Sequence, residues 1–132
     1  MKTKLTIGLA IALTVSLLLY WGGFLGGIRM YSDPQAMRNE VLRKIPLGSR
    51  IEDAEQIMKE NGFGCRLVKN EGFTEYADGD VHRPIEHEGQ DFLSCGKRKM
   101  TWLLVTRDWS VIIVHQGGIV SEVYVNTGLT GP

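Results

Sequence analysis

The chain has 132 residues, with 15 basic and 15 acidic side chains, 43% hydrophobic residues and two cysteines. This length suits one domain of ordinary size and not two. The zero net charge argues against a nucleic-acid partner, which favours a basic face. The apolar fraction excludes a disordered chain. The hydrophobic residues are unevenly distributed, because an uncharged segment occupies the N-terminus.

This N-terminal segment, residues 5–28, contains 24 residues and no charged side chain. As a helix it extends about 36 Å, more than the ~30 Å hydrocarbon core of a bilayer. We predict an uncleaved signal-anchor, because small residues do not stand where a signal peptidase needs them. Residues 1–4 are then a cytoplasmic stub, and residues 29–132 form an extracytoplasmic domain. A poorly marked, cleavable signal peptide is the alternative.

The orientation and the cellular location of the span are predicted from the flanking charges and from the cysteines. Basic residues flank it on both sides, so the charge bias leaves the orientation open. Two cysteines beyond the span favour an exported domain. This places the chain in the bacterial inner membrane, with its C-terminal domain in the periplasm or outside. The spacing of Gly22 and Gly26 is typical of helices that dimerise in lipid, although these glycines also fit a simple membrane exit.

The domain begins with two predicted helices. Asp33 can cap a first helix that has Pro34 at its first position, and Pro46 ends it. The apolar side chains of this helix recur every four residues: Met37, Val41 and Ile45. Ser49 and Glu52 have the spacing of a capping box for a second helix.

The second helix has its own apolar stripe and a clear end. The stripe consists of Ile51, Ala54, Ile57 and Met58. Asn61 and Gly62 end the helix, and Phe63 is placed for the apolar contact that accompanies such an end. Two helices of about 11 and 12 residues cannot bury enough surface alone, so they must pack on another element.

That element is a predicted sheet. The expected extended segments are 64–68, 92–98, 102–105, 109–115 and 119–126. Gly117 and Gly118 suit the tight turn between the last two. Helices followed by strands indicate an α+β fold, in which a helical hairpin packs on an antiparallel sheet of three or four strands.

Between the first two strands, we expect a long acidic loop, residues 70–90. Its carboxylates are Glu71, Glu75, Asp78, Asp80, Glu86 and Glu88, opposed within the loop by one Arg83. The simplest interpretation is a solvated loop, partly neutralised by the basic stretch 97–99. The alternative is a partner-binding loop on a rigid scaffold.

The two cysteines, Cys65 and Cys95, both fall in predicted strands of the exported domain. An even number of cysteines in that compartment predicts a disulfide. The bridge would close a loop of about 31 residues, worth roughly 3.5–4 kcal/mol in the chain-entropy estimate. Two buried free thiols, or a catalytic thiol, are the alternatives; a nucleophile needs a base, and no histidine stands nearby in sequence.

The remaining residues give little sign of catalysis or metal binding. His82 and His87 lie among carboxylates, but their spacing matches no metal-binding loop. No glycine-rich phosphate loop or nucleophile elbow occurs in the sequence. Trp102 and Trp109 suit packing better than binding, and His115 fits an exposed strand end. We predict no enzyme, no metal and no cofactor.

Two stretches carry a resemblance to a known family. Residues 46–63, which contain Pro46, Gly48 and the second predicted helix, resemble the helical hairpin of the SmpA/OmlA (BamE-type) small envelope proteins. Residues 109–123 resemble their closing β-hairpin. The β-lactamase-inhibitor proteins share this architecture. The resemblance, over residues 34–126, implies a non-enzymatic domain that binds other envelope proteins. The chain departs from the family in three features: it lacks a lipidated cysteine, it has no proline after the helix-end glycine, and it carries the acidic segment.

Three functions remain open on this evidence. The first is a membrane-anchored adaptor or scaffold that binds another envelope protein through the acidic loop or the strand edges. The second is a periplasmic inhibitor or immunity protein whose acidic loop blocks a partner. The third is a metal-dependent enzyme that uses His82, His87 and neighbouring carboxylates.

Overall fold

The computed structural model describes four stretches of the chain: residues 13–14, 27–76, 82–102 and 104–130. Of Trp102 it describes the backbone alone. Most of the predicted span 5–28, including Gly22 and Gly26, lies outside the described residues, as does the stub 1–4. Within the described part of the chain, no helix is long and apolar enough to cross a membrane.

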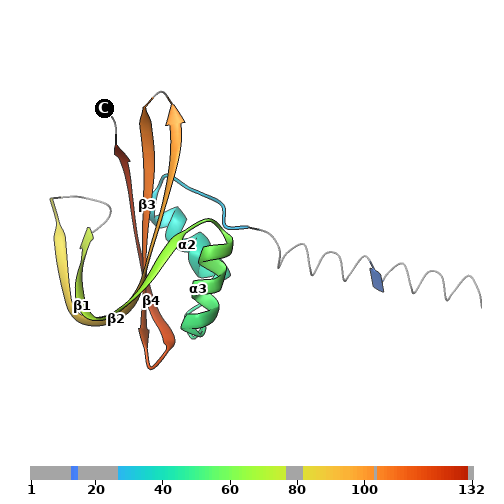
Figure 1. Ribbon diagram of the computed structural model, residues 1–132, viewed down its shortest axis with the longest axis vertical. Helices are drawn as coiled ribbons and strands as arrows, with labels where there is room; N and C mark the ends of the chain where they lie inside the picture. The colour runs from blue at the N-terminus through green and yellow to red at the C-terminus, as the bar shows by residue number, and fades with distance from the viewer. Residues whose placement is uncertain (1–12, 15–26, 77–81, 103, 131–132) are drawn as a thin grey trace, which may run out of the picture.

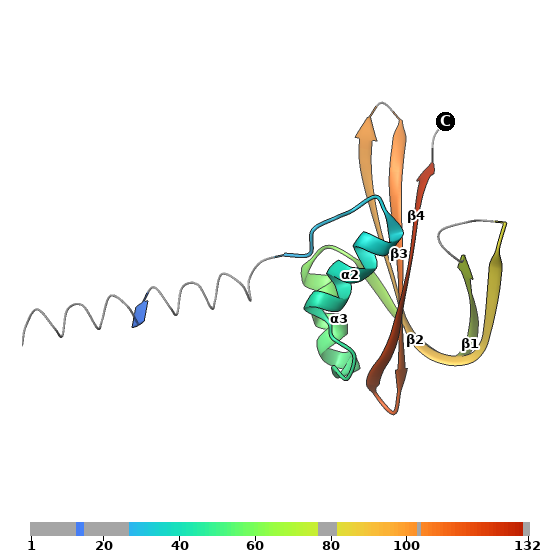
Figure 2. The same cartoon turned by 180° about the vertical axis from the view of Figure 1, so that it is seen from behind.

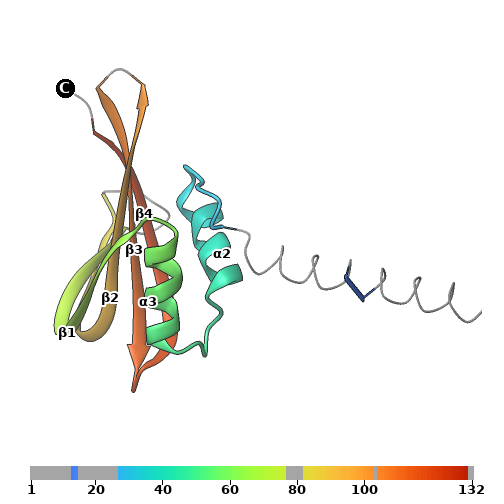
Figure 3. The same cartoon turned by 45° about the vertical axis from the view of Figure 1, so that its right-hand side comes forward.

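The domain consists of two helices followed by a four-stranded antiparallel sheet, which confirms the predicted α+β fold. The strands are ordered β1-β2-β3-β4, and both helices cover one face of the sheet (Figures 1 and 3). The elements are α2 (Pro34–Lys44), α3 (Ile51–Glu60), β1 (Gly64–Tyr76), β2 (Pro84–Trp102), β3 (Val105–Gln116) and β4 (Ile119–Thr130).

Helix α2 forms for the reasons that the sequence indicates. The side chain of Asp33 accepts a hydrogen bond from the Ala36 N–H at 2.9 Å, and Pro34 is the first helical residue. The stripe of Met37, Val41 and Ile45 is fully buried against the sheet. The helix ends before Pro46, as predicted.

The capping box predicted for α3 is wrong. Ser49 Oγ donates to the Pro46 carbonyl at 2.6 Å, and Arg50 occupies the N-cap position with no capping hydrogen bond from its side chain. The reason is tertiary: the Ile51 N–H donates to the Gly118 carbonyl at 2.8 Å, and the Val120 N–H donates to Ser49 O at 2.8 Å. Pairing with the start of β4 therefore satisfies backbone groups that a local cap would otherwise bond.

The end of α3 is as predicted. The Phe63 N–H donates to the Met58 carbonyl and the Gly62 N–H to the Lys59 carbonyl, both at 3.1 Å. This pair of bonds is the Schellman motif, with Gly62 in the left-handed conformation at φ 84°. Phe63 is buried and begins the approach to β1.

The predicted acidic loop, residues 70–90, is largely wrong as a loop. Strands β1 and β2 continue as a paired hairpin to Tyr76 and Pro84, with Phe73 opposite His87. Two register shifts interrupt the pairing on either side of Glu71. A Cβ atom at Gly72 would lie 2.8 Å from the His87 carbonyl oxygen, so the close approach of the strands requires glycine there. We call this hairpin, residues 71–76 and 84–90, the arm.

The other hairpins are longer than the sequence suggests. Strand β3 starts at Val105, and the expected extended run 102–105 is instead the point where β2 turns into β3, with Leu104 at φ 66°. The turn from β3 to β4 is the predicted one: Gly117 and Gly118 both have positive φ, which a two-residue hairpin turn requires.

Hydrophobic residues form two clusters, one on each face of the sheet. The larger lies beneath the helices and includes Leu93, Val111, Ile113 and Val123. The smaller cluster lies on the other face, because successive side chains of a strand point to opposite faces. It consists of Val68, Phe92, Ile112 and Val114, with Phe73 and Tyr124 packed against them. The arm bends away from the helices in a U shape (Figures 1 and 2), so that Phe73 reaches this second cluster.

Candidate functional site

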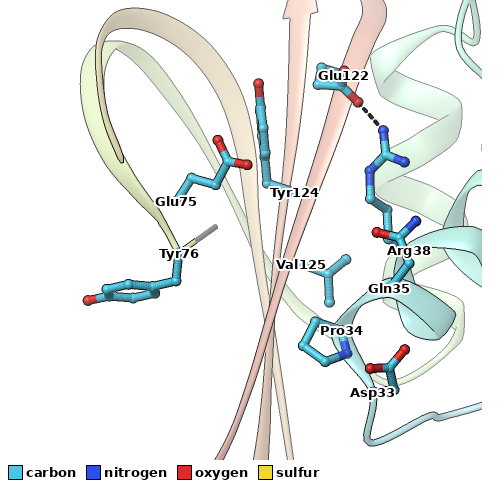
Figure 4. A pocket seen from close by; sticks show the side chains of 9 residues that line it. All are labelled: Asp33, Pro34, Gln35, Arg38, Glu75, Tyr76, Glu122, Tyr124 and Val125. Atoms are coloured by element: carbon cyan, nitrogen blue, oxygen red, sulfur yellow. Dashed lines mark hydrogen bonds and ion pairs between the residues drawn. The ribbon is translucent and has the colours of Figure 1, made fainter. Parts of the chain in front are cut away.

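A groove of about 520 Å³ lies where the start of α2, the tip of the arm and strand β4 meet (Figure 4). Its size falls within the usual range of ligand-binding clefts. The lining residues are Asp33, Pro34, Gln35, Arg38, Glu75, Tyr76, Glu122, Tyr124 and Val125. Figure 4 shows the α2 residues on one side of β4 and the arm residues on the other.

A second, smaller hollow of about 260 Å³ shares Tyr76 with this groove. Its other lining residues are Asp108, Trp109, Ser110, Asn126, Thr127 and Gly128. The lining of the two hollows follows β4 from Glu122 to Gly128, and we refer to the two hollows jointly as the β4 trough.

One end of the β4 trough is closed by an ion pair. Arg38 donates from Nε to the Val123 carbonyl at 2.8 Å and from Nη2 to Glu122 Oε1 at 2.5 Å. The same Glu122 oxygen accepts the Val123 N–H at 2.9 Å. Both backbone groups of Val123 on the free side of β4 are therefore bonded by side chains.

This arrangement fixes the direction of the other backbone groups along β4. In an antiparallel strand, the N–H and C=O of alternate residues point to the same side. The register with β3 is continuous from Glu122 to Thr130. Val125, Thr127 and Leu129 therefore direct their backbone groups away from β3, as Val123 does. No hydrogen bond joins these groups to any residue in the described part of the chain.

The β4 trough is acidic. Asp33, Glu75, Asp108 and Glu122 contribute carboxylates, and Arg38 is the one Lys or Arg among the lining residues. Burial raises the pKa of Glu122, but the hydrogen bonds from the Val123 N–H and Arg38 outweigh it, so the net shift is downward. Burial, followed by the charges of Glu122 and Glu75, raises the pKa of Tyr124. The trough thus holds the ionised carboxylate of Glu122 beside the protonated phenol of Tyr124 at neutral pH.

An aromatic cluster holds the arm side of the trough in place. The rings of Phe73 and His87 stack with centroids 4.7 Å apart, and Tyr124 lies 5.0 Å from His87. His87 Nε2 lies 2.9 Å from Glu75 Oε2, so this ring also orients a trough carboxylate. Strand alternation places Phe73, Glu75 and His87 on one face of the arm.

The carboxylates of the predicted acidic loop are separated by the strand pairing. Glu75 faces the trough, whereas Glu86 accepts a hydrogen bond from Thr74 Oγ1 at 3.0 Å on the other face of the arm. Glu71 and Glu88 are exposed. The two remaining acids, Asp78 and Asp80, lie outside the described residues.

The cysteines stand opposite each other on β1 and β2, as the predicted bridge requires. Their Sγ atoms are 2.7 Å apart, which is longer than the ~2.05 Å of a disulfide, and both are free thiols. Burial raises the pKa of Cys65 and, more strongly, that of Cys95. Protonated thiols are poor nucleophiles, so this environment does not favour the catalytic-thiol interpretation.

The other residues considered for chemistry are spread through the fold. Among the described residues, no three His, Cys, Asp or Glu side chains are grouped to hold a metal. His82 lies in the turn that precedes β2, and His115 is half-buried near the end of β3. Trp109 packs in the main core, where its Nε1 donates to the Tyr31 carbonyl at 2.7 Å. The side chain of Trp102 lies outside the described part.

Comparison with known proteins finds no match to any family model, curated protein or solved structure. The resemblance to the BamE-type envelope proteins therefore stays a prediction. Sequence reasoning missed Arg38, Tyr76 and Tyr124 as site residues. Arg38 and Glu122 meet across 84 positions of sequence, and no local pattern announces such a contact.

Proposed function

We propose that residues 29–132 form a non-enzymatic protein-binding domain and that the β4 trough is its binding site. The observation that carries this proposal is the trough itself. It is acidic, its larger hollow lies between α2 and the arm, and it runs along a strand whose outward backbone groups are in part unbonded. Clefts with a few well-positioned polar groups are the usual sites of recognition.

The state of the polar side chains supports recognition over catalysis. Arg38 is paired with Glu122, and Glu75 is paired with His87. These neighbours hold the charged side chains in place, which gives a partner a pre-ordered surface of defined charge. A hydrolytic or transfer reaction would need a nucleophile beside a base, and the two thiols lie on strands outside the trough lining.

The proposal includes a tether. Residues 5–28 form an uncharged stretch long enough to cross a bilayer. The last residue of this stretch, Ile28, is already part of the domain: it is buried in the core, and its N–H donates to Asn61 Oδ1 at 2.8 Å. The next N–H, of Arg29, donates to Glu40 Oε1 at 3.1 Å. A span in the bacterial inner membrane would hold the domain close to the periplasmic surface, where another envelope protein is the natural partner.

Site-specific photocrosslinking in bacterial cells tests the proposal. A photoreactive phenylalanine analogue would replace Tyr76 in the trough of the full chain. The matched control would carry it at Leu67, which is 52% exposed on β1, the strand at the opposite edge of the sheet from β4. We expect a crosslinked partner from position 76 alone, and a weaker crosslink once Glu75 and Glu122 are changed to glutamine. Equal crosslinking from both positions would show that the trough is not the binding site.

A further inference from the structure

The two edges of the sheet differ in how they are protected. Exposed strand edges can pair with other chains, so proteins normally twist, charge or cover them. The β1 edge is interrupted by two register shifts, one on each side of Glu71. The β4 edge is closed at Val123 by Arg38 and Glu122. Beyond Val123, the described structure places no bonding partner on the outward backbone groups of residues 125, 127 and 129.

We infer that residues 125–129 of β4 accept an extended segment of the partner protein as a fifth, added strand. This inference rests on the proposed function, because it requires the β4 trough to be the binding site. Strand addition uses main-chain hydrogen bonds for affinity and side-chain pockets for specificity. The open edge supplies N–H and C=O groups at Val125, Thr127 and Leu129, and the closed edge at Val123 sets where the added strand stops.

The walls of the trough favour one strand of a partner over a second copy of the chain. An edge-to-edge dimer would bring the partner copy's own α2 and arm against these walls. Pro34 and Gln35 stand on one side of the open edge, and Tyr76 stands on the other. A single extended segment carries no such helix or hairpin with it, so it avoids this clash.

The two walls also specify the chemistry of the added strand. Its residues opposite Tyr124 and Asn126 would lie on the arm side, beside Glu75 and Glu122. Lysine or arginine at these positions would complement the acidic side chains of this wall. Its residue opposite Leu129, whose side chain is 58% exposed, would lie on the helix side and suits a β-branched or aromatic residue. The added strand is therefore expected to alternate basic and apolar residues.

The test selects peptides of about seven residues, enough to span the open edge, from a phage-displayed random library. The full-length chain is immobilised in detergent micelles. Binding of the selected peptides to the native chain and to Thr127→Pro is then measured. Proline removes the outward N–H of Thr127 without breaking a bond to β3. Thr127→Val keeps this N–H and is the matched control. Leu129→Pro, with Leu129→Ala as its control, repeats the comparison near the strand end.

We expect selected peptides in which basic and apolar residues alternate. Their affinity should fall about fivefold with each proline variant, since one hydrogen bond is worth roughly 1 kcal/mol, and stay within about twofold with each control. N-methylating alternate peptide residues should abolish binding in one register and spare it in the other. Both variants must retain the circular dichroism spectrum of the native chain, and the strand-end variant covers the case in which Thr127→Pro does not fold.

The remaining outcomes separate two failures. If the affinity of the peptides falls with Glu75→Gln but does not change with the proline variants or with N-methylation, the trough is a binding site and strand addition is wrong. Selection of no peptide that responds to any trough substitution would overturn the proposed function together with the inference. A dimer of the native chain that Thr127→Pro dissociates would replace the partner strand with a second copy.

Discussion

Strands β1 and β2 contribute to two regions, the helix-covered part of the sheet and the arm, and these two regions are held in different ways. Under the helices the register is continuous from Gly64 to Val68, and Leu93 and Cys95 are buried in a large apolar cluster. In the arm the register shifts twice, and most side chains are polar and exposed or half-exposed. An aromatic cluster around Phe73 is its main attachment to the rest of the molecule.

This difference separates stability from recognition. Apolar burial is the main source of folding free energy, so the helix-covered half should determine global stability. Segments with few buried contacts open locally at lower cost, and binding elements are commonly drawn from them. The arm can therefore adjust one wall of the β4 trough without unfolding the domain.

The largest expected effect comes from the main core. Ile113 is fully buried between the helices and the sheet. Ile113→Ala should lower the free energy of unfolding by about 2–5 kcal/mol, through lost apolar contact and a residual cavity. Urea denaturation followed by circular dichroism measures this change. A loss below about 1 kcal/mol would mean that the core repacks around the site.

The cysteine pair should act on the same half of the sheet. The backbone N–H and C=O of Val125 point away from β3, so those of its pair partner Val111 point towards β2 and Cys95. The backbone groups of Cys95 therefore point towards β3, and Cys65 and Cys95 form a non-hydrogen-bonded pair. Cα atoms in such pairs are about 4.5 Å apart, which a disulfide can bridge. Oxidation should add roughly 3.5 kcal/mol of stability that reductant removes.

Peptide mapping by mass spectrometry would identify the bridge between Cys65 and Cys95. Cys65→Ser is the control, and its stability should not respond to reductant. Native protein that stays reduced under mild oxidation, or gains no stability from the bridge, would contradict this prediction.

The buried carboxylate of Glu40, paired with the exposed Arg43, should make the stability of the helix layer depend on pH. Glu40 is 7% exposed and accepts hydrogen bonds from Arg43 and from the Arg29 N–H. The hydrogen bond from Arg43 lowers the pKa of Glu40, against the opposing effect of burial. The folded-state pKa therefore lies below the unfolded value, so the stabilisation is complete above the unfolded pKa and is lost as pH falls through the folded one.

Glu40→Gln should cost about 1.5–3 kcal/mol at neutral pH, as expected for a charge-assisted hydrogen bond. The difference between variant and native chain should shrink in acid, below the ordinary glutamate pKa of about 4.3. Thermal unfolding at several pH values measures it, and Gln35→Glu provides an exposed comparison on the same helix. A constant difference at all pH values would assign the cost to packing instead.

The smallest global effect is expected in the arm. Phe73→Ala removes the stack on His87 and the contacts with Phe92 and Tyr124. Aromatic pairs of this kind contribute about 0.5–1.5 kcal/mol. Hydrogen exchange should accelerate at arm amides such as Thr74 while Leu93 stays protected. If Phe73→Ala destabilised the chain as much as Ile113→Ala, the arm would belong to the same cooperative unit as the core.

Features that depend on neighbours in sequence were predictable. The start of α2 at Asp33 and Pro34, the end of α3 at Gly62 and the turn at Gly117 and Gly118 all follow from local backbone chemistry. The apolar stripes and the alternation along β4 indicated which side chains would be buried. These signals were sufficient for the α+β class and for the position of both helices.

Features that depend on distant segments were decided by the tertiary structure alone. The capping box at Ser49 was displaced because Gly118, far along the chain, bonds the first α3 amide. The polar segment 70–90 resembled a loop because its strands pair away from the main core, where alternation carries little apolar signal. The β4 trough arises where Arg38 meets Glu122 and the arm returns to Tyr124. Composition and spacing predict the helices and strands. The way these elements pack in the folded domain decides which charged side chains and free backbone groups lie together in the trough.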